Sequence, residues 1–265
     1  PEFLFEHIKE CRTGGYGDRS DIDERMWAAM ELYRTTGEAH YLALARTLFD
    51  QHPNPIQYGW GDISGFAGWA LLENELMPKD SIKEGDVFTA EEIEFRSAYR
   101  ELLLKEAARL LSVIDTEGYC VAMRPPEYGW GSNLTVLNRG MLLGTAYLLD
   151  PKTSYLSGVV HQMDYLLGVN ATDYSYVTGV GGHAFCNPHN RITQADSIEE
   201  TIPGYVSGGA NGTRWVDPLA KELIPEGTPP MKCFADRWEC YSLNEITIYW
   251  NSPAIFCAAF LDSVK

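Results

Sequence analysis

The sequence lacks an apolar run of the roughly 20 residues needed to span a bilayer, and residues 1–30 have no basic start followed by an apolar core. Basic residues are also few, since 21 Lys and Arg stand against 37 Asp and Glu, giving a formal net charge of -16. This charge repels nucleic acids and anionic membranes at long range, so we expect neither as a partner. A neutral or cationic ligand fits the charge better.

The six cysteines are scattered, without CxxC pairs or histidines at metal-binding spacing. We therefore expect buried free thiols rather than a disulfide framework. The chain begins at Pro1, without Met, and continues at once into an amphipathic stretch over 3–11. This beginning predicts a fragment or a processed chain.

Helical periodicity dominates the sequence, and strand patterns are scarce. Together with the opening stretch we expect about eight helices. The other predicted helices cover 21–35, 38–50, 64–76, 90–114, 134–149, 153–167 and 243–262. The pattern predicts an all-α domain of helical hairpins packed side by side. A long segment over 170–238, rich in glycine and aromatic residues, lies between two helices. A loop of this length is normally either functional or disordered, and its aromatic residues, which could anchor it, favour function.

Two carboxylates stand in an aromatic cluster over 234–252. Asp236 and Glu245 are separated by Trp238 and Tyr241. Aromatic faces take water away from a carboxyl group and favour its protonated form, which suits Glu245 to act as a general acid. The alternative is that Glu245 lies in the first turn of the following helix, where the helix dipole stabilises its charge.

A second cluster lies over 175–191. Ser175, Thr178, His189 and Arg191 surround a glycine-rich bend, and the last two can direct hydrogen-bond donors to hydroxyls or a carboxylate. The cluster is a poor candidate for a phosphate site, because no Lys-Ser/Thr and no helix start follow the glycines.

The two clusters resemble the signature regions of glycoside hydrolase family 9, the inverting β-glycosidases best known as cellulases. The first match consists of Phe234, Asp236, Tyr241, Glu245, Thr247, Asn251 and Ser252. The second consists of Ser175, Val177, Thr178, Gly181, His189 and Arg191. The second pattern departs from the family at His183 and Asn190. Supporting matches lie at 23–37, 58–65, 128–149, 165–170 and 202–211.

The resemblance implies an (α/α)6 barrel of six helical hairpins with a substrate cleft at one end. It also implies that residues 1–265 are the C-terminal part of a single catalytic domain. The first hairpins, and the aspartate loop that supplies the family's catalytic base, would then lie outside this chain. We expect that missing N-terminal part as a partner.

The resemblance further implies hydrolysis of β-1,4-glucosidic bonds in cellulose or related β-glucans with inversion. The predicted catalytic residues are Glu245, as general acid, and Asp236. The predicted substrate-binding residues are His189, Arg191, Tyr241, Trp130, Trp215 and Trp238. His189 and Arg191 would bind sugar hydroxyls, and the tryptophans would stack on sugar rings, although core packing is an open alternative for each tryptophan.

Calcium is the one cofactor that the resemblance implies, and no organic cofactor is expected. The predicted ligands are Ser20, Asp23, Glu24 and Asp62, whose oxygen atoms suit this ion. The alternative is an acidic first helical turn that complements the helix dipole without an ion.

Two other functions stay open at this point. One is exo-β-D-glucosaminidase action on chitosan oligosaccharides, since an acidic protein favours a cationic sugar. The other is a non-catalytic carbohydrate-binding fragment, because one carboxylate cannot complete an inverting displacement. In each case the partner is a β-linked polysaccharide or oligosaccharide, which predicts an extracellular, secreted protein.

Overall fold

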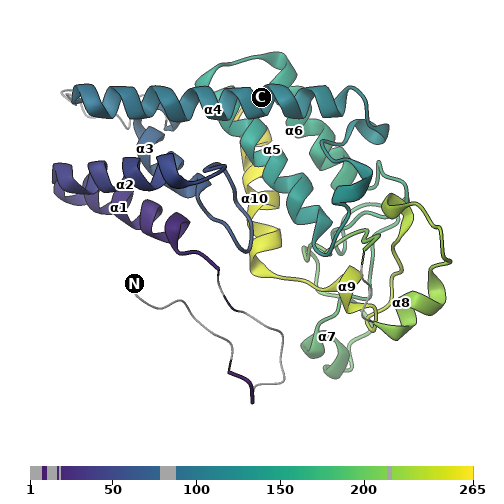
Figure 1. Ribbon diagram of the computed structural model, residues 1–265. Coiled ribbons are helices and arrows are strands. Elements are labelled where there is room, and N and C mark those ends of the chain that lie inside the picture. Colours follow the sequence, from purple (N-terminus) through teal and green to yellow (C-terminus); the bar gives the residue numbers. More distant parts are fainter. Residues whose placement is uncertain (1–7, 11–16, 18, 78–87, 214–216, 265) are drawn as a thin grey trace. The chain divides into compact units, whose positions relative to one another are not determined.

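The computed structural model of the protein describes residues 8–10, 17, 19–77, 88–213 and 217–264 (Figure 1). Regular structure in these residues is helical, and the β-structure found there consists of four isolated bridges. The chain divides into two compact units, Pro1–Leu104 and Lys105–Lys265. Among the helices that the structure describes, none combines the length and the apolar character that a membrane span requires.

The first unit is a group of helices. It contains α1 (Ile22–Thr36), α2 (Ala39–Gln51), α3 (Gly65–Leu76) and the first part of α4 (Ala90–Ile114). α1 packs against α2 and α3 because Met26 and Met30, one turn apart, bury the same helix face. α3 lies close to α4, where Gly68 leaves room for the ring of Tyr99.

The second unit contains the rest of α4 and a layer of helices followed by long loops. Its other elements are η2 (Gly118–Cys120), η3 (Pro125–Glu127), α5 (Ser132–Leu149), α6 (Thr153–Leu166), α7 (Arg191–Ala195), α8 (Pro218–Leu223), η4 (Pro230–Lys232), α9 (Tyr241–Asn244) and α10 (Ile248–Ser263). α5 packs against both α6 and α10. Gly140 permits this approach, since a Cβ there would lie 3.0 Å from Cys257 Sγ on α10 and 3.3 Å from Gln162 Cβ on α6.

Most of the predicted helices are confirmed. α1 to α6 begin and end within two residues of the predicted bounds. The predicted helix over 243–262 is wrong at its beginning, because the helical path is interrupted at Glu245–Thr247 and α10 begins at Ile248. The predicted helix over 3–11 lies outside the described residues, apart from the non-helical 8–10.

The thiol prediction is confirmed in part. Cys233, Cys240 and Cys257 are buried free thiols, but Cys120 and Cys186 are free and exposed. Cys120 ends the short η2 and Cys186 lies in a loop, and neither belongs to a long helix whose periodicity would predict burial. Cys11 lies outside the described residues.

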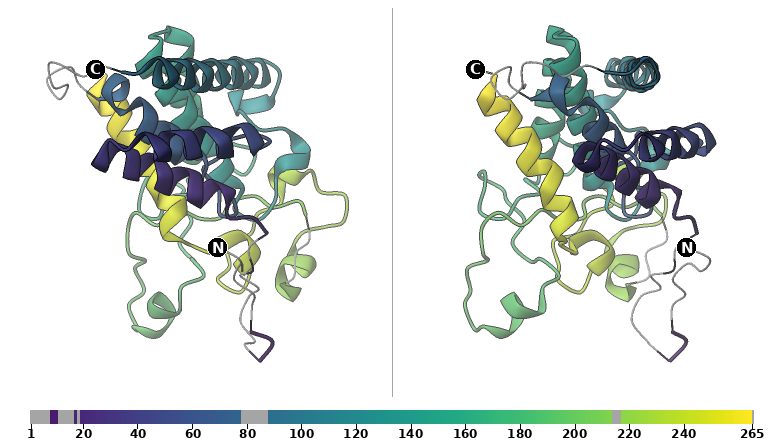
Figure 2. Two further views of the ribbon diagram at one scale, coloured as in Figure 1. Left: turned by 60° about the vertical axis from the view of Figure 1, so that its left-hand side comes forward. Right: turned by 90° about the vertical axis from the view of Figure 1, so that its left-hand side faces the viewer.

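The segment between α6 and α9 is long but anchored. Tyr176 and Phe185 are fully buried, and the ring of Tyr176 meets that of Phe234 edge-on at 5.0 Å. Figure 2 shows these loops, with α7, α8 and α9, at the end of the second unit where α10 begins. The loops thereby gather the residues of both sequence clusters at one end of the unit.

Candidate active site

Glu245 is held in an extended segment between α9 and α10. Its backbone pairs with His189 in a parallel bridge, in which His189 N donates to Asn244 O at 2.8 Å. On the other side Gly208 N donates to Glu245 O at 2.9 Å, and Ser207 pairs with Ile246. Two separate loops therefore fix this backbone, and Glu245 does not occupy the first turn of α10, whose N-cap is Thr247.

The carboxyl group of Glu245 is half-buried among aromatic rings. Trp130 Nε1 donates a hydrogen bond to Glu245 Oε2 at 2.8 Å. The indole ring of Trp130 lies 5.9 Å from the ring of Tyr241, which stands one turn before Glu245 on α9. The carboxyl group of Glu245 and the rings of Trp130 and Tyr241 therefore lie close together.

His189 completes the cluster. Its ring stacks on Trp238 with centroids 5.9 Å apart and an interplanar angle of 9°, and it lies 5.5 Å from the ring of Tyr241. His189 Nδ1 is 2.7 Å from Trp238 O. Because a carbonyl oxygen can only accept, Nδ1 carries a proton, and in the neutral ring Nε2 is the acceptor.

The structure gives Asp236 a different set of contacts. Its Oδ2 accepts from Cys186 N at 2.9 Å, and its Oδ1 accepts from Asn187 N at 2.9 Å. The carboxylate thereby holds the loop that leads to His189. In the described part of the chain, no hydrogen bond joins the side chains of Asp236 and Glu245.

Two other predicted binding residues are not placed in the cluster. Arg191 is the first residue of α7 and is exposed, and it forms no ion pair within the described residues. Asn190 caps this short helix through a 2.9 Å bond from Ile192 N to its Oδ1. Trp215 lies outside the described residues.

The sequence patterns did not single out two buried polar residues that hold α9 in place. Asp217 is fully buried, and its carboxylate accepts from Ser242 N at 3.0 Å and from Ser242 Oγ at 2.9 Å, which fixes the beginning of α9. Asn244 Nδ2 donates to Ala235 O and Arg237 O, which ties α9 to the segment carrying Trp238. The Asp-Pro pair at 217–218 is a helix-start signal, but Asn244 carries no comparable sequence mark.

The predicted calcium ligands all belong to the first unit. Asp23 is buried, and its Oδ2 accepts from Ile63 N at 2.8 Å, beside Asp62. Asp62 accepts from Ser64 N at 3.0 Å and lies 3.3 Å from His52 Nε2. Ser20 Oγ accepts from Ile22 N at 3.3 Å, and Glu24 is exposed. Among the described residues, no group of three or more His, Cys, Asp or Glu side chains is placed to hold a metal ion.

The chain is similar to proteins that degrade cellulose and its fragments. It is 39% identical over 269 residues to a cellodextrinase of Butyrivibrio fibrisolvens, covering 96% of this chain and 46% of that protein. It is 33% identical over 278 residues to a cellulose 1,4-beta-cellobiosidase of Acetivibrio thermocellus, covering 95% of this chain and 29% of the relative. The chain thus spans less than half the length of these two relatives.

Solved structures show the same relationship. A thermostable endoglucanase of Alicyclobacillus acidocaldarius matches with a TM-score of 0.83 and 30% identity, over 98% of this chain and 46% of the endoglucanase. These neighbours are (α/α)6 barrel enzymes, which confirms the predicted fold class. The sequence model of the family described as glycosyl hydrolase family 9 matches residues 3–258, which include parts of both compact units. The chain therefore belongs to glycosyl hydrolase family 9.

Proposed function

We propose that the protein hydrolyses β-1,4-glucosidic bonds in cellulose or related β-glucans with inversion, and that Glu245 is the general acid. The observation that supports this role is the placement of a half-buried carboxyl group on a doubly bridged backbone, beside Trp130 and Tyr241. A general acid needs a fixed position and a site from which water is partly removed.

The chemistry requires two carboxyl groups. The protonated Glu245 would give its proton to the glycosidic oxygen as the bond from that oxygen to the sugar breaks. A second carboxylate, roughly 6.5–9.5 Å away, would take a proton from the water that attacks the opposite face of the sugar. We propose that this base belongs to the part of the catalytic domain that the relatives have and this chain does not span.

The neighbouring side chains suit a sugar substrate. Flat rings such as Trp130, Trp238 and Tyr241 offer apolar faces to the C–H surface of a pyranose, and His189 Nε2 can accept from a hydroxyl. One related structure is a complex with cellobiose-like isofagomine, at 30% identity and a TM-score of 0.82. Binding of sugar hydroxyls by Arg191 and stacking by Trp215 remain part of the proposal.

An apolar face near Glu245 supports the proposal that more of the domain packs here. Ile248 and Ile255 of α10 are 90% and 66% exposed. They border a groove of about 430 Å³ that also includes Ile246, the residue after Glu245. Exposed apolar side chains that border a groove are suited to packing against another part of a protein. We propose that the remainder of the catalytic domain covers it and places the base beside the groove.

Calcium and location complete the proposal. We propose that Ser20, Asp23, Glu24 and Asp62 bind a calcium ion at the beginning of α1; the support is the chemistry of their oxygen atoms and the contact of Asp23 with the backbone beside Asp62. We also propose that the protein acts outside the cell, because insoluble or polymeric glucans are met there.

The test is hydrolysis of cello-oligosaccharides by the full-length protein, with chitosan oligosaccharides as the comparison. We expect cleavage of the glucans, with the α-anomer as the first product seen by proton NMR, and no activity of the 265-residue chain alone. Glu245→Gln should abolish turnover, while Glu239→Gln, the same change at an exposed position nearby, should retain it. Unchanged hydrolysis by Glu245→Gln would remove the assignment, and preferential cleavage of chitosan would change the substrate class.

A further inference from the structure

The hydrogen bond from Trp130 to Glu245 joins residues 115 positions apart. It uses Oε2 alone, so the two oxygens of the carboxyl group are not equivalent. The tryptophan also remains 47% exposed, which leaves part of its ring available to a ligand. A residue that only stacked on a sugar would not need its indole N–H aimed at the acid.

We propose that Trp130 is a positioning residue that assigns the acid proton to Glu245 Oε1 and stabilises the carboxylate left behind. This inference rests on the proposed function of Glu245. The indole N–H can only donate, so an oxygen that accepts from it is unsuited to carry the proton. During cleavage the Oε1–H bond breaks, its electron pair stays on the carboxyl group, and the proton forms a bond with the glycosidic oxygen. The negative charge then shared by Oε2 strengthens the bond from the indole.

The backbone around Trp130 is built to hold this orientation. Gly131 has φ 75, which strains any residue with a Cβ, and a Cβ at this position would lie a crowded 3.2 Å from the Trp250 ring, so both conformation and space favour glycine here. Ser132 N donates to Gly129 O, and Leu134 N donates to Gly131 O, at the beginning of α5. The indole therefore projects from a tight turn that leads into a buried helix.

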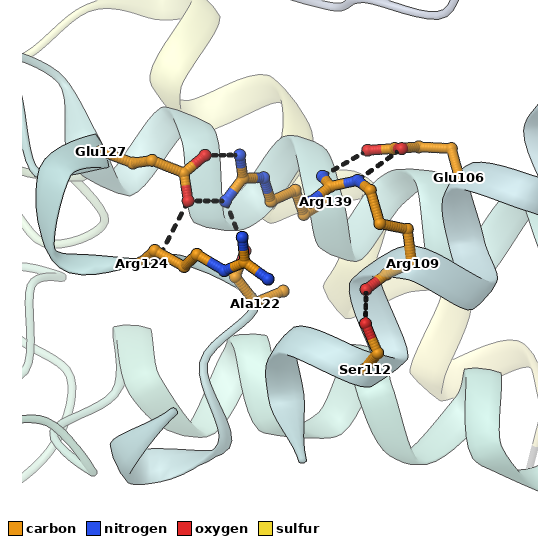
Figure 3. Close-up of polar contacts among 7 residues, drawn as sticks. All are labelled: Glu106, Arg109, Ser112, Ala122, Arg124, Glu127 and Arg139. Carbon is orange, nitrogen blue, oxygen red and sulfur yellow. Dashed lines mark hydrogen bonds and ion pairs between the residues drawn. The ribbon is translucent and has the colours of Figure 1, made fainter. Parts of the chain in front are cut away.

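The ion pair between Glu127 and Arg139 holds the chain just before the turn that carries Trp130 (Figure 3). Glu127 accepts from the guanidinium of Arg139 on α5 and from Arg124 N at 2.7 Å. Burial raises the pKa of the Glu127 carboxyl, but the bonds from Arg139 and Arg124, with the charge of Arg109, outweigh it, and the pKa lies below the ordinary value of 4.5. Gly129 N donates to Glu127 O at 2.9 Å, which joins the pair to the residue before Trp130.

The other titratable groups around Glu245 are few in the described structure. His189 pairs with Glu245 through the backbone from the segment before α7, and Tyr241, on α9, lies 5.5 Å from the His189 ring. On the α5 side, Glu127 ends η3 and Arg139 lies on α5, and these two residues are paired with each other. From the α5 side, therefore, it is the indole N–H of Trp130 that donates a hydrogen bond to the Glu245 carboxyl group.

The test compares Trp130→Phe with Trp238→Phe in the full-length protein. Both changes keep an aromatic ring and remove an indole N–H, but only Trp130 donates to Glu245 within the described residues. In the pH dependence of kcat/KM, we expect Trp130→Phe to move the alkaline limb to higher pH by about half to one unit. The reason is that loss of the indole donor favours the protonated form of the acid. Trp238→Phe should leave the limb in place, whatever its effect on KM.

NMR of the unaltered protein gives a second measurement that does not depend on a variant folding. The indole N–H signal of Trp130 should shift as Glu245 ionises, and this shift should be absent in Glu245→Gln. An unmoved alkaline limb in Trp130→Phe, the same displacement in Trp238→Phe, or an indole signal insensitive to Glu245 would overturn the inference. Failure of the proposed function is distinguishable, because Glu245→Gln would then remain active.

Discussion

Replacing Asp236 with Asn separates a structural role from a catalytic one. The aspartate uses both oxygens to accept from the backbone of the 186–187 loop, at 2.9 Å each. Asn keeps one of these acceptors and turns an N–H₂ donor toward the other amide. Net contributions of about 1.5–3 kcal/mol are typical for a hydrogen bond to a charged group, and this site is only half-buried, so we expect a loss of about 2 kcal/mol.

The expected effect of Asp236→Asn on turnover depends on the 186–187 loop that Asp236 holds. If Asp236 acts by holding the segment that leads to His189, a small displacement of that side chain should lower kcat/KM by about 10-fold to 100-fold. Urea denaturation of Asp236→Asn gives the free energy of unfolding, and hydrolysis of cello-oligosaccharides gives the rate. Asp196→Asn is a matched control, because Asp196 is exposed and accepts one backbone N–H, and it should change stability by less than about 0.5 kcal/mol.

Cys186 offers an independent readout of the same loop. Burial and the charge of Asp236 raise the pKa of its thiol, in that order. Asp236→Asn removes the second cause and loosens the loop, so alkylation of Cys186 should become faster, with exposed Cys120 as the internal reference. Unchanged stability and alkylation together with a loss of more than about 10³-fold in kcat would refute the structural role and support a direct part in proton transfer.

Two further predictions concern pH and calcium. Because the pKa of Glu127 is lowered in the folded protein, its pair with Arg139 should stabilise the protein above the ordinary value of 4.5 and lose this effect as pH falls through the folded value. Glu127→Gln should therefore reduce stability at neutral pH more than at pH 3, and an equal loss at both would contradict this reasoning. Excess calcium should raise the melting temperature, equivalent to about 2.7 kcal/mol at a hundredfold excess over Kd. Asp23→Asn should abolish that response, and a protein indifferent to both calcium and a chelator would contradict the proposed site.

The helices were predictable because their apolar stripes repeat with helical period. α1 is an example, since its buried Met26 and Met30 are visible in the sequence as one face and its stop is visible as Gly37. The interruption before α10 was not predictable in this way. Glu245 to Thr247 lie inside an apolar, helix-like stretch, and bridges to His189 and Ser207, which lie in distant loops, hold this segment extended.

The candidate site was predictable in composition but not in arrangement. The two sequence clusters contain His189, Trp238, Tyr241 and Glu245, and the structure brings these together. The sequence does not show that Asp236 accepts from backbone amides, because those amides lie about 50 positions earlier in the chain and only the fold brings them to Asp236. Nor does spacing reveal which tryptophan aims its N–H at the acid, and that contact becomes visible only when α5 and α9 are placed together.

The most direct test of Glu245 as the proton donor compares two leaving groups in Glu245→Gln. A cello-oligosaccharide needs a proton on its departing oxygen, whereas a dinitrophenyl β-cellobioside releases a phenolate that does not. We predict a loss of more than about 10³-fold on the oligosaccharide and a much smaller loss on the aryl glycoside. Equal losses on both substrates, or none on either, would contradict the role of Glu245 as the general acid.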